Sequence, residues 1–192
     1  GTLPRAQIAA IDAAWSVRHG TPRGFSMSRP GAVDLSTQQV FLIWRGACLQ
    51  GYCSFHQTDR AWALDLMPQH PAAPDGAMHL AIAHALTHAK ALGIQQVSLT
   101  AVPDHGSRSH PLWARALQRL TERLDNPGLR QFKASFDPVW RPLYLVAPSK
   151  TALFCAGLEV CDCIARPAAT PSSKTHDLYE GYAFASYSRP MA

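Results

Sequence analysis

The most regular pattern of hydrophobic and polar positions lies between residues 61 and 93, where a short apolar run, a proline-rich loop and a helical repeat follow one another. Apolar side chains recur every three or four residues in this repeat, which gives a helix one apolar face. They are Met78, Ala81, Ile82, Ala85, Leu86, Ala89 and Leu92. With Asp75 as the N-cap and Gly93 just past the last turn, the pattern predicts a helix launched at Asp75–Gly76 that stops at Gly93.

The apolar run before this helix predicts a buried strand that ends at Met67, and three prolines bend the loop between the two elements. The N-terminus of a helix presents free backbone N–H groups and the positive end of the helix dipole. The start of the helix, Gly76–Met78, is therefore a candidate site for an anionic or carbonyl group. Asp65 lies at the mouth of this site, near the end of the strand.

The remaining patterns predict helices and short strands in alternation. The expected elements are a helix over Pro4–His19 with Ile8, Ile11 and Trp15 on one face, a hairpin of Val40–Trp44 and Leu49–Phe55, an antiparallel strand over Trp62–Met67, a strand over Val97–Thr100, a helix over Leu112–Leu124, a strand over Pro142–Val146 and a last helix over Thr151–Ile164. Asn126-Pro127-Gly128 is expected to break the second long helix.

This order of elements predicts an α/β (α+β) fold with a mixed central sheet flanked by helices. Because Val97–Thr100 follows a helix, it is expected to lie parallel to the strand before that helix through a right-handed crossover. The order is that of the GNAT acyltransferase fold, in which two central strands splay apart and the gap receives the acyl donor. We therefore predict a GNAT-like fold.

The length and composition favour one domain with a tail. A chain of 192 residues with 47% hydrophobic content can bury a core. We predict a domain over residues 1–165 and a Pro/Ser/Thr-rich tail over residues 166–192. No stretch is long and apolar enough to span a bilayer, and no signal-peptide pattern is present. A start at Gly1 without Met indicates a processed or recombinant fragment.

Cysteine usage and net charge indicate the cellular location of the chain and the kind of partner that it binds. The five cysteines are odd in number and lack the CxxC spacing, which favours reduced thiols and a cytoplasmic location. The net charge of +5 suits an anionic partner such as RNA or an acidic lipid surface. His84 and His88 have the i, i+4 spacing of zinc ligands, but no glutamate follows the first histidine and no third ligand is evident. No metal is therefore expected.

A set of short motifs, spread in order over Ile11 to Val160, points to one family. The motifs are the Trp15 helix, Gly24-Phe25-Ser26, Asp65-Leu66-Met67, Pro71, Pro74, Gly76-Ala77-Met78, Ser98-Leu99, Gly128-Leu129-Arg130, Phe132-Lys133, Phe136, Trp140-Arg141-Pro142 and Tyr144-Leu145-Val146. In this ordered set the sequence resembles the C-terminal cytoplasmic domain of the phosphatidylglycerol lysyltransferase (multiple peptide resistance factor) family, which includes the alanyl-phosphatidylglycerol synthases.

The resemblance implies a bacterial aminoacyltransferase with a GNAT-like fold. It implies a tunnel shared by aminoacyl-tRNA and a lipid head group, with transfer of the aminoacyl group to the glycerol hydroxyl of phosphatidylglycerol. It implies no cofactor. Family members usually carry a preceding GNAT-like domain and a membrane-embedded part, so the expected location is the cytoplasm, at the inner face of the cell membrane through such segments.

The chemistry of this transfer assigns roles to the matching residues. Asp65 is expected to orient or deprotonate the attacking hydroxyl. Lys133, Arg130 and Arg141 are expected to hold phosphates, with Lys133 at the catalytic centre beside Asp65. The backbone at Gly76, Ala77 and Met78 is expected to polarise the ester carbonyl. Because the aminoacyl ester is already activated, positioning supplies most of the rate.

Each of these residues also has a structural interpretation. Asp65 fits equally well as a structural carboxylate paired to an arginine. Lys133 and Arg130 lie in an amphipathic aromatic segment, where most such residues are surface charges. Gly76 fits as a simple helix-start glycine.

Three positions depart from the family pattern. Pro68 stands where an arginine usually follows the DLM triplet, Ser135 replaces the second lysine of the FKxKF motif, and Thr100 replaces the glycine of SLG. These departures leave open a non-catalytic GNAT-like binding or regulatory module. A stand-alone GNAT enzyme that uses an acyl-CoA is a further alternative, although Ala73, three residues before Gly76, does not match the coenzyme A pyrophosphate signature.

Overall fold

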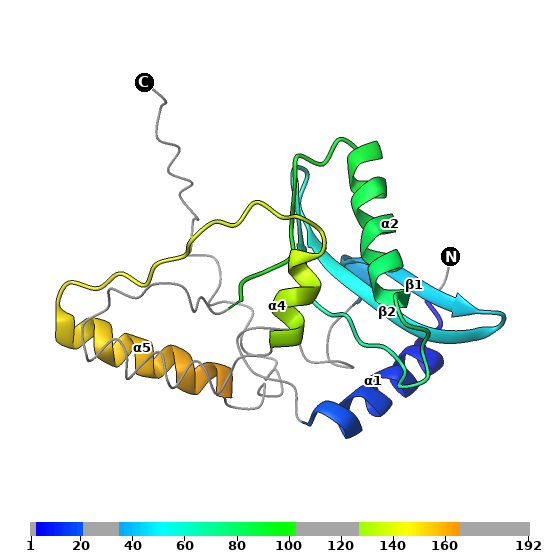
Figure 1. The fold of residues 1–192 in the computed structure, drawn as a ribbon, viewed down its shortest axis with the longest axis horizontal. Coiled ribbons are helices and arrows are strands. Elements are labelled where there is room, and N and C mark those ends of the chain that lie inside the picture. Colours follow the sequence, from blue (N-terminus) through cyan, green and yellow to red (C-terminus); the bar gives the residue numbers. More distant parts are fainter. Residues whose placement is uncertain (1–2, 21–34, 103–126, 166–192) are drawn as a thin grey trace.

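The computed structural model describes residues 3–20, 35–102 and 127–165, which form a mixed α/β fold (Figure 1). The elements in chain order are α1 (Arg5–His19), the short 3₁₀ helix η1 (Leu35–Thr37), β1 (Gln39–Arg45), β2 (Cys48–Gln57), β3 (Ala61–Leu64), α2 (Ala77–Ala91), β4 (Gln96–Ser98), α4 (Pro127–Ala134) and α5 (Lys150–Ala165). The predicted helices at both ends of this order are confirmed. No helix in these three ranges has the length and apolar character needed to cross a membrane.

The sheet has four strands in the order β1-β2-β3-β4. β1 and β2 form the predicted hairpin, and Gly46 takes a positive φ of 58° in its tight turn. β3 pairs antiparallel with β2, and β4 pairs parallel with β3 after the intervening helix α2, as predicted. The sheet is therefore mixed, and its parallel pair lies at the β4 edge.

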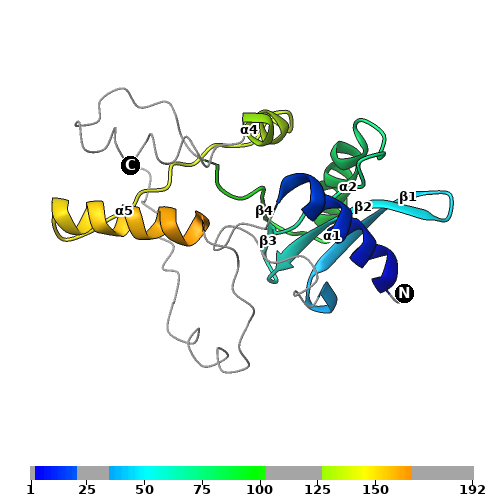
Figure 2. The same ribbon diagram turned by 90° about the horizontal axis from the view of Figure 1, so that it is seen from below.

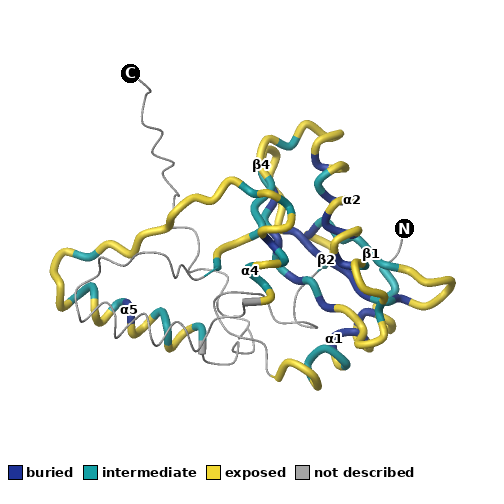
Figure 3. Tube along the Cα trace, in the orientation of Figure 1, coloured by how far each residue is buried: buried dark blue, intermediate teal, exposed yellow. Residues whose placement is uncertain are grey.

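Two apolar clusters cover the sheet, one with α2 and one with α1. Figure 3 colours the buried residues of these elements dark blue. The larger cluster joins α2 to the sheet through Phe55 and Trp62, and the smaller one joins α1 through Ile8 and Ile11 to the fully buried Tyr52. Phe55 and Tyr52 are three residues apart on β2, so they point to opposite faces of the sheet. α1 and α2 therefore pack on different faces.

Helix α2 follows its predicted apolar face but begins differently. Met78, Ala81, Ile82, Ala85 and Ala89 are buried, whereas Leu92, which the pattern placed on the same face, is 55% exposed. The helix ends at Ala91, and Gly93 follows the cap residue with φ 74°; the amides of Gly93 and Ile94 donate back to Lys90 and Ala89, as in a Schellman motif. The N-cap is Gly76 in a left-handed conformation, so the prediction of Asp75 as N-cap is wrong.

A β-bulge ends strand β3 earlier than predicted. The amide of Asp65 donates to the Ser54 carbonyl, and the Ser54 amide donates to the Leu66 carbonyl, so two residues oppose one. The extra residue turns the side chains that follow to the other face. Leu64 accordingly belongs to the α2 cluster, whereas Leu66 belongs to the α1 cluster. The regular strand stops at Leu64 rather than at Met67.

Two predictions between residues 126 and 146 are wrong. The helix α4 begins at Pro127, where the sequence suggested a break; proline fits the first position of a helix because its missing N–H would have no partner there. Residues Pro142–Val146 form no strand with the described sheet. In Figures 1 and 2, this segment and α5 lie away from the sheet.

Some predictions fall outside the described ranges. These are the helix over Leu112–Leu124, the Gly24-Phe25-Ser26 motif and the tail over residues 166–192. All five cysteines are within the described ranges and are free thiols.

Candidate active site

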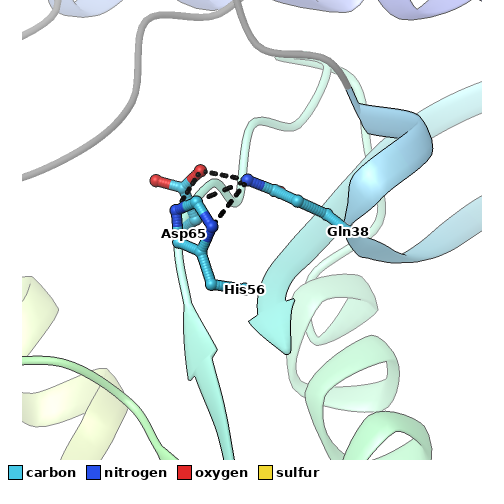
Figure 4. Close-up of polar contacts among 3 residues, drawn as sticks. All are labelled: Gln38, His56 and Asp65. Atoms are coloured by element: carbon cyan, nitrogen blue, oxygen red, sulfur yellow. Dashed lines mark hydrogen bonds and ion pairs between the residues drawn. The ribbon is translucent and has the colours of Figure 1, made fainter. Parts of the chain in front are cut away.

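Asp65 is placed by the bulge at the end of β3, and among the described residues its carboxylate contacts the side chains of Gln38 and His56 (Figure 4). The Gln38 amide donates a hydrogen bond of 2.8 Å to Asp65 Oδ2, and His56 Nε2 lies 3.3 Å from the same oxygen. The Asp65 side chain is 4% exposed, whereas that of His56 is 62% exposed. The arrangement is a buried carboxylate that holds an accessible imidazole.

Both ring nitrogens of His56 lie near the Gln38 amide. The Gln38 amide nitrogen is 3.3 Å from His56 Nδ1 and 3.5 Å from His56 Nε2, and Nε2 also lies 3.3 Å from Asp65 Oδ2. Each ring nitrogen donates or accepts according to the tautomer and the protonation state of the imidazole. An imidazole next to a carboxylate is able to take up a proton, and the carboxylate stabilises the resulting cation.

Lys133 is buried, so its interpretation as a surface charge is wrong. Its side chain comes from α4, and the residue is 3% exposed. Its ammonium donates to the Thr100 hydroxyl at 3.0 Å and to the carbonyls of Thr100 and Ala101 at 3.4 Å. Burial lowers the pKa of Lys133 to about 8. Within the described ranges, no carboxylate forms an ion pair with this ammonium.

Asp65 and the contact point of Lys133 occupy corresponding positions on neighbouring strands. The parallel pairing of β3 and β4 ends at Ala63 opposite Ser98, and Asp65 and Thr100 each lie two residues further along. The chain after β3 stays bonded to β2, while Thr100 turns away from the sheet with a positive φ of 63°. The two chains thus part at this point, and Lys133 bonds to Thr100 and Ala101 rather than to Asp65.

A pocket of about 320 Å³ opens at the N-terminus of α2. Its wall consists of Trp15, His19, Met67, Gln69, Pro74, Asp75, Gly76, Met78, His79, Gly128, Leu129 and Phe132. Two of the predicted binding residues, Gly76 and Met78, are therefore in the wall of one pocket. The other predicted site residues, Asp65, Ala77, Arg130, Lys133 and Arg141, are not in it.

The pocket wall contains unused backbone donors. No side chain caps α2, and the Ala77 amide donates to Pro74. Within the described part of the chain, the amides of Met78 and His79 donate no hydrogen bond to the backbone before the helix. An oxyanion or phosphate is a suitable partner for such a pair of amides.

Helix α4 carries both Lys133 and the pocket residue Phe132. The rings of Phe132 and Phe136 lie 4.5 Å and 5.5 Å from that of His79, which fastens α4 to the first turn of α2. The guanidinium of Arg130 lies 5.3 Å from the centre of the Trp140 ring, a cation–π distance. Arg141 is exposed. Lys133 is thus adjacent to the pocket residue Phe132, whereas Arg141 is exposed and does not line the pocket.

Sequence reasoning missed His56 and Gln38. The pairing register of β2 and β3 contains a signal for His56, because His56 lies opposite Ala63 and so diagonally next to Asp65 on the same face. Gln38 precedes β1, and no short-range pattern connects it with Asp65. His84 is exposed, and His88 lies 5.8 Å from Phe41 in a ring contact. The described residues contain no cluster of three metal-binding side chains.

Comparisons with known proteins agree on one family. The family model "Phosphatidylglycerol lysyltransferase, C-terminal" matches residues 2–147. The C-terminal domain of a proposed lysylphosphatidylglycerol synthetase from Agrobacterium fabrum is 21% identical with a TM-score of 0.73, over 86% of this chain and 52% of that one. L-PGS from Bacillus licheniformis is 18% identical with a TM-score of 0.66, over 84% of this chain and 51% of that one.

At these identities the two structures are evidence of a shared fold, and the predicted GNAT-like fold class is confirmed. The chain spans about half the length of each of these two proteins. A search of curated proteins found no match.

Proposed function

Because the chain belongs to the family of phosphatidylglycerol lysyltransferase C-terminal domains, we propose that it transfers an aminoacyl group from aminoacyl-tRNA to a glycerol hydroxyl of phosphatidylglycerol. The matched residues 2–147 include the Asp65 cluster, Lys133 and the pocket. The observation that carries the proposal is the arrangement just beyond the paired ends of β3 and β4, where the buried Asp65 carboxylate and Thr100, the acceptor for the buried Lys133 ammonium, each lie two residues further along the chain.

The reaction is a transesterification that needs few catalytic groups. The glycerol oxygen forms a bond to the aminoacyl carbonyl carbon, and the bond from that carbon to the ribose oxygen of the tRNA breaks. The proton of the glycerol hydroxyl passes to the base and then to the departing ribose oxygen. Atoms and charges balance without an oxidant, a metal or a cofactor. Correct placement of two reactants supplies the largest part of the rate.

We assign the proton transfer to His56 and its orientation to Asp65. With 62% of its side chain exposed, His56 is open to a substrate hydroxyl, whereas the Asp65 carboxylate is nearly sealed. The carboxylate therefore acts through the imidazole, which it holds at 3.3 Å, and stabilises the imidazolium that forms. Gln38 fixes both partners through its amide nitrogen.

We assign the recognition of phosphate to Lys133. A buried ammonium whose acceptors are a hydroxyl and two carbonyls lacks the negative charge that usually compensates such a group. A phosphate of the lipid or of the tRNA 3′ end supplies that charge. Arg130 in α4 and Arg141, which follows Trp140, are assigned to the remaining phosphates.

The pocket at α2 is assigned to the aminoacyl ester. The amides of Met78 and His79 are available for the oxygen that becomes negative in the tetrahedral intermediate. The apolar walls from Met67, Leu129 and Phe132 accommodate the carbon skeleton. Charged tRNA is cytoplasmic and phosphatidylglycerol is a membrane lipid, so the proposed reaction takes place at the inner membrane face. Because the chain spans half of its relatives, we expect a preceding GNAT-like or membrane domain to increase the rate.

Product analysis tests the proposal. The full chain is incubated with charged tRNA and phosphatidylglycerol vesicles, and the extracted lipids are stained with ninhydrin. We expect a new ninhydrin-positive lipid that Asp65→Ala and Lys133→Ala both suppress, and that Lys90→Ala, which removes an exposed lysine of α2, leaves unchanged. Absence of the product, from this chain and from the chain joined to its natural neighbours, would favour the non-catalytic binding module.

A thermal-shift measurement separates the acyl-CoA alternative. A ligand that binds the native state raises the melting temperature. Acetyl-CoA is expected to leave the melting temperature unchanged. An increase with acetyl-CoA, together with acetylation of an amine, would favour the stand-alone GNAT enzyme instead.

A further inference from the structure

The wall of the pocket at the start of α2 contains a carboxylate, that of Asp75, and the indole ring of Trp15. Among the wall residues that the structure describes, none is a lysine or an arginine. With its histidines counted as neutral, the described wall therefore carries one formal negative charge. A wall of this composition favours a ligand that carries a positive charge.

A tight turn fixes Asp75 beside the first turn of α2. The Ala77 amide donates to the Pro74 carbonyl at 3.1 Å, and Gly76 has φ 80° and ψ −7°, the values of the third residue of a type II turn. Asp75 is the second residue of this turn, and it is exposed. No ion pair with another described residue engages its carboxylate. The carboxylate is therefore available to a ligand in the pocket.

Trp15 adds an aromatic surface to the same wall from α1. Its ring stacks on that of His19, with 4.8 Å between the ring centres and 22° between the planes. His19 Nδ1 donates to the Trp15 carbonyl at 3.1 Å, which orients the histidine. The indole is the best cation–π partner among the aromatic side chains. The aromatic surface and the carboxylate thus favour the same kind of ligand, a cation.

The pocket also offers hydrogen-bond donors. The amides of Met78 and His79 donate no hydrogen bond to the backbone before the helix and suit an oxygen that becomes negative. One ligand that matches both features carries a cation close to a carbonyl group. An α-aminoacyl ester has this pattern, because its ammonium is attached to the carbon next to the carbonyl. A simple acyl ester lacks the cation, and N-acylation turns the ammonium into a neutral amide.

We propose that Asp75 and Trp15 bind the α-ammonium of the aminoacyl group, so that the pocket selects aminoacyl esters whose α-ammonium is free. The inference rests on the proposed function, because it assigns one part of the aminoacyl group to residues of the same pocket. By holding the ammonium, these two side chains place the ester carbonyl at the amides of Met78 and His79. They determine specificity and take no part in proton transfer.

Two small probes test this recognition without tRNA or lipid. L-Alaninamide has an α-ammonium next to a carbonyl, and L-lactamide has a neutral hydroxyl in place of the ammonium. Each probe is titrated into the full chain at pH 7, and the backbone amide NMR signals of Met78 and His79 report binding. We expect alaninamide to bind about fivefold more tightly than lactamide, the effect of an accessible ion pair with a cation–π contact.

Asp75→Asn should make the affinities for the two probes equal, and Trp15→Leu should reduce the difference between them. Because Gly76 is the N-cap of α2, Asp75→Asn should leave the melting temperature unchanged. Asp59→Asn, at an exposed position between β2 and β3 and outside the pocket wall, is the matched control and should keep the preference. Equal affinities in the native chain, binding of neither probe, or a preference that persists in Asp75→Asn would overturn the inference.

Transfer from N-acetylated aminoacyl-tRNA separates this inference from the proposed function. With a labelled amino acid and phosphatidylglycerol vesicles, we expect the free aminoacyl group to be transferred about fivefold faster than the acetylated one. Asp75→Asn should remove most of this difference. Equal rates in the native chain would overturn the inference and leave the proposed transfer standing. Transfer from neither tRNA would contradict the proposed function, and the probe titration would then decide whether the pocket binds the ammonium.

Discussion

At the scale of single residues, Lys133 illustrates a conflict between stability and function. Its ammonium is 3% exposed and lacks a carboxylate partner in the described ranges, and burial lowers its pKa to about 8. A poorly compensated charge lowers the stability of the native state, and under the proposed function the same charge binds the substrate phosphate.

Replacing Lys133 with methionine should therefore raise stability while abolishing transfer. We expect the free energy of unfolding at pH 7 to rise by on the order of 1 kcal/mol, because the desolvated charge is gone and the side-chain volume is nearly kept. Urea unfolding measures the change, and Lys90→Met on the exposed side of α2 is the control. A loss of stability would show that Lys133 is a structural tether to Thr100.

The lowered pKa also predicts a pH dependence. Between about pH 8, where Lys133 titrates in the native state, and its ordinary pKa of 10.5, the unfolded chain binds more protons than the folded one. Stability contributed by this group therefore rises with pH across that window. Comparison of the native chain with Lys133→Met by urea unfolding from pH 7 to pH 10.5 isolates this slope. Equal slopes would contradict the burial of the charge.

His56 leads to a prediction about catalysis. His56→Gln should lower the transfer rate about 100-fold, since general-base catalysis contributes at least that much. His84→Gln, at an exposed position on α2, is the matched control and should retain full activity. The initial rate of lipid aminoacylation checks both variants, and an active His56→Gln enzyme would remove the imidazole from the mechanism.

At the scale of elements, the bulge after β3 positions the site. Gly51 of β2 allows the following segment to approach closely, because a Cβ at that position would lie 2.9 Å from the Pro68 carbonyl oxygen and 3.0 Å from Gln69 Cβ. The isolated bridge between Gly51 and Gln69 lies at the same place. This contact holds the segment from Asp65 to the pocket residues Met67 and Gln69.

Gly51→Ala should consequently push this segment off β2. We expect a loss of roughly 1 to 3 kcal/mol in the free energy of unfolding, the usual cost of overpacking, and reduced transfer. Urea unfolding and the lipid assay measure the two effects. Gln50→Ala, next in the chain, is the control and should change stability by about 0.5 kcal/mol or less. An unchanged Gly51→Ala protein would show that the segment yields easily.

Local patterns predicted most elements and missed those that depend on distant contacts. The spacing of Met78 to Ala89 was sufficient for α2, because one buried face fixes a helix. The bulge at Asp65 depends on pairing with Ser54, which no short pattern contains. Helix α4 was missed because Pro127 reads equally well as a break and as a helix start. The family resemblance pointed to Asp65 and Lys133, but the partnership with His56 and Gln38 becomes visible only once β2 and β3 are in register.

At the scale of the whole molecule, the helices pack on the two faces of the sheet, and the candidate site lies where β3 and β4 end. α1 and α2 cover opposite faces of the sheet, the chains after β3 and β4 part between the Asp65 cluster and Lys133, and α4 closes the pocket at the start of α2. The match to the phosphatidylglycerol lysyltransferase C-terminal family covers residues 2–147, which include all of these features. The chain spans about half the length of the two similar solved structures.

The most direct measurement follows isotopically labelled aminoacyl-tRNA in the presence of vesicles that contain either phosphatidylglycerol or phosphatidic acid. Both lipids carry a phosphate, but phosphatidic acid lacks the free glycerol hydroxyl that the mechanism acylates. The expected result is label in the lipid extract with phosphatidylglycerol and none with phosphatidic acid. Label that remains on the tRNA or appears as free amino acid with both lipids, even when the chain is joined to its natural neighbours, would contradict the proposed transfer.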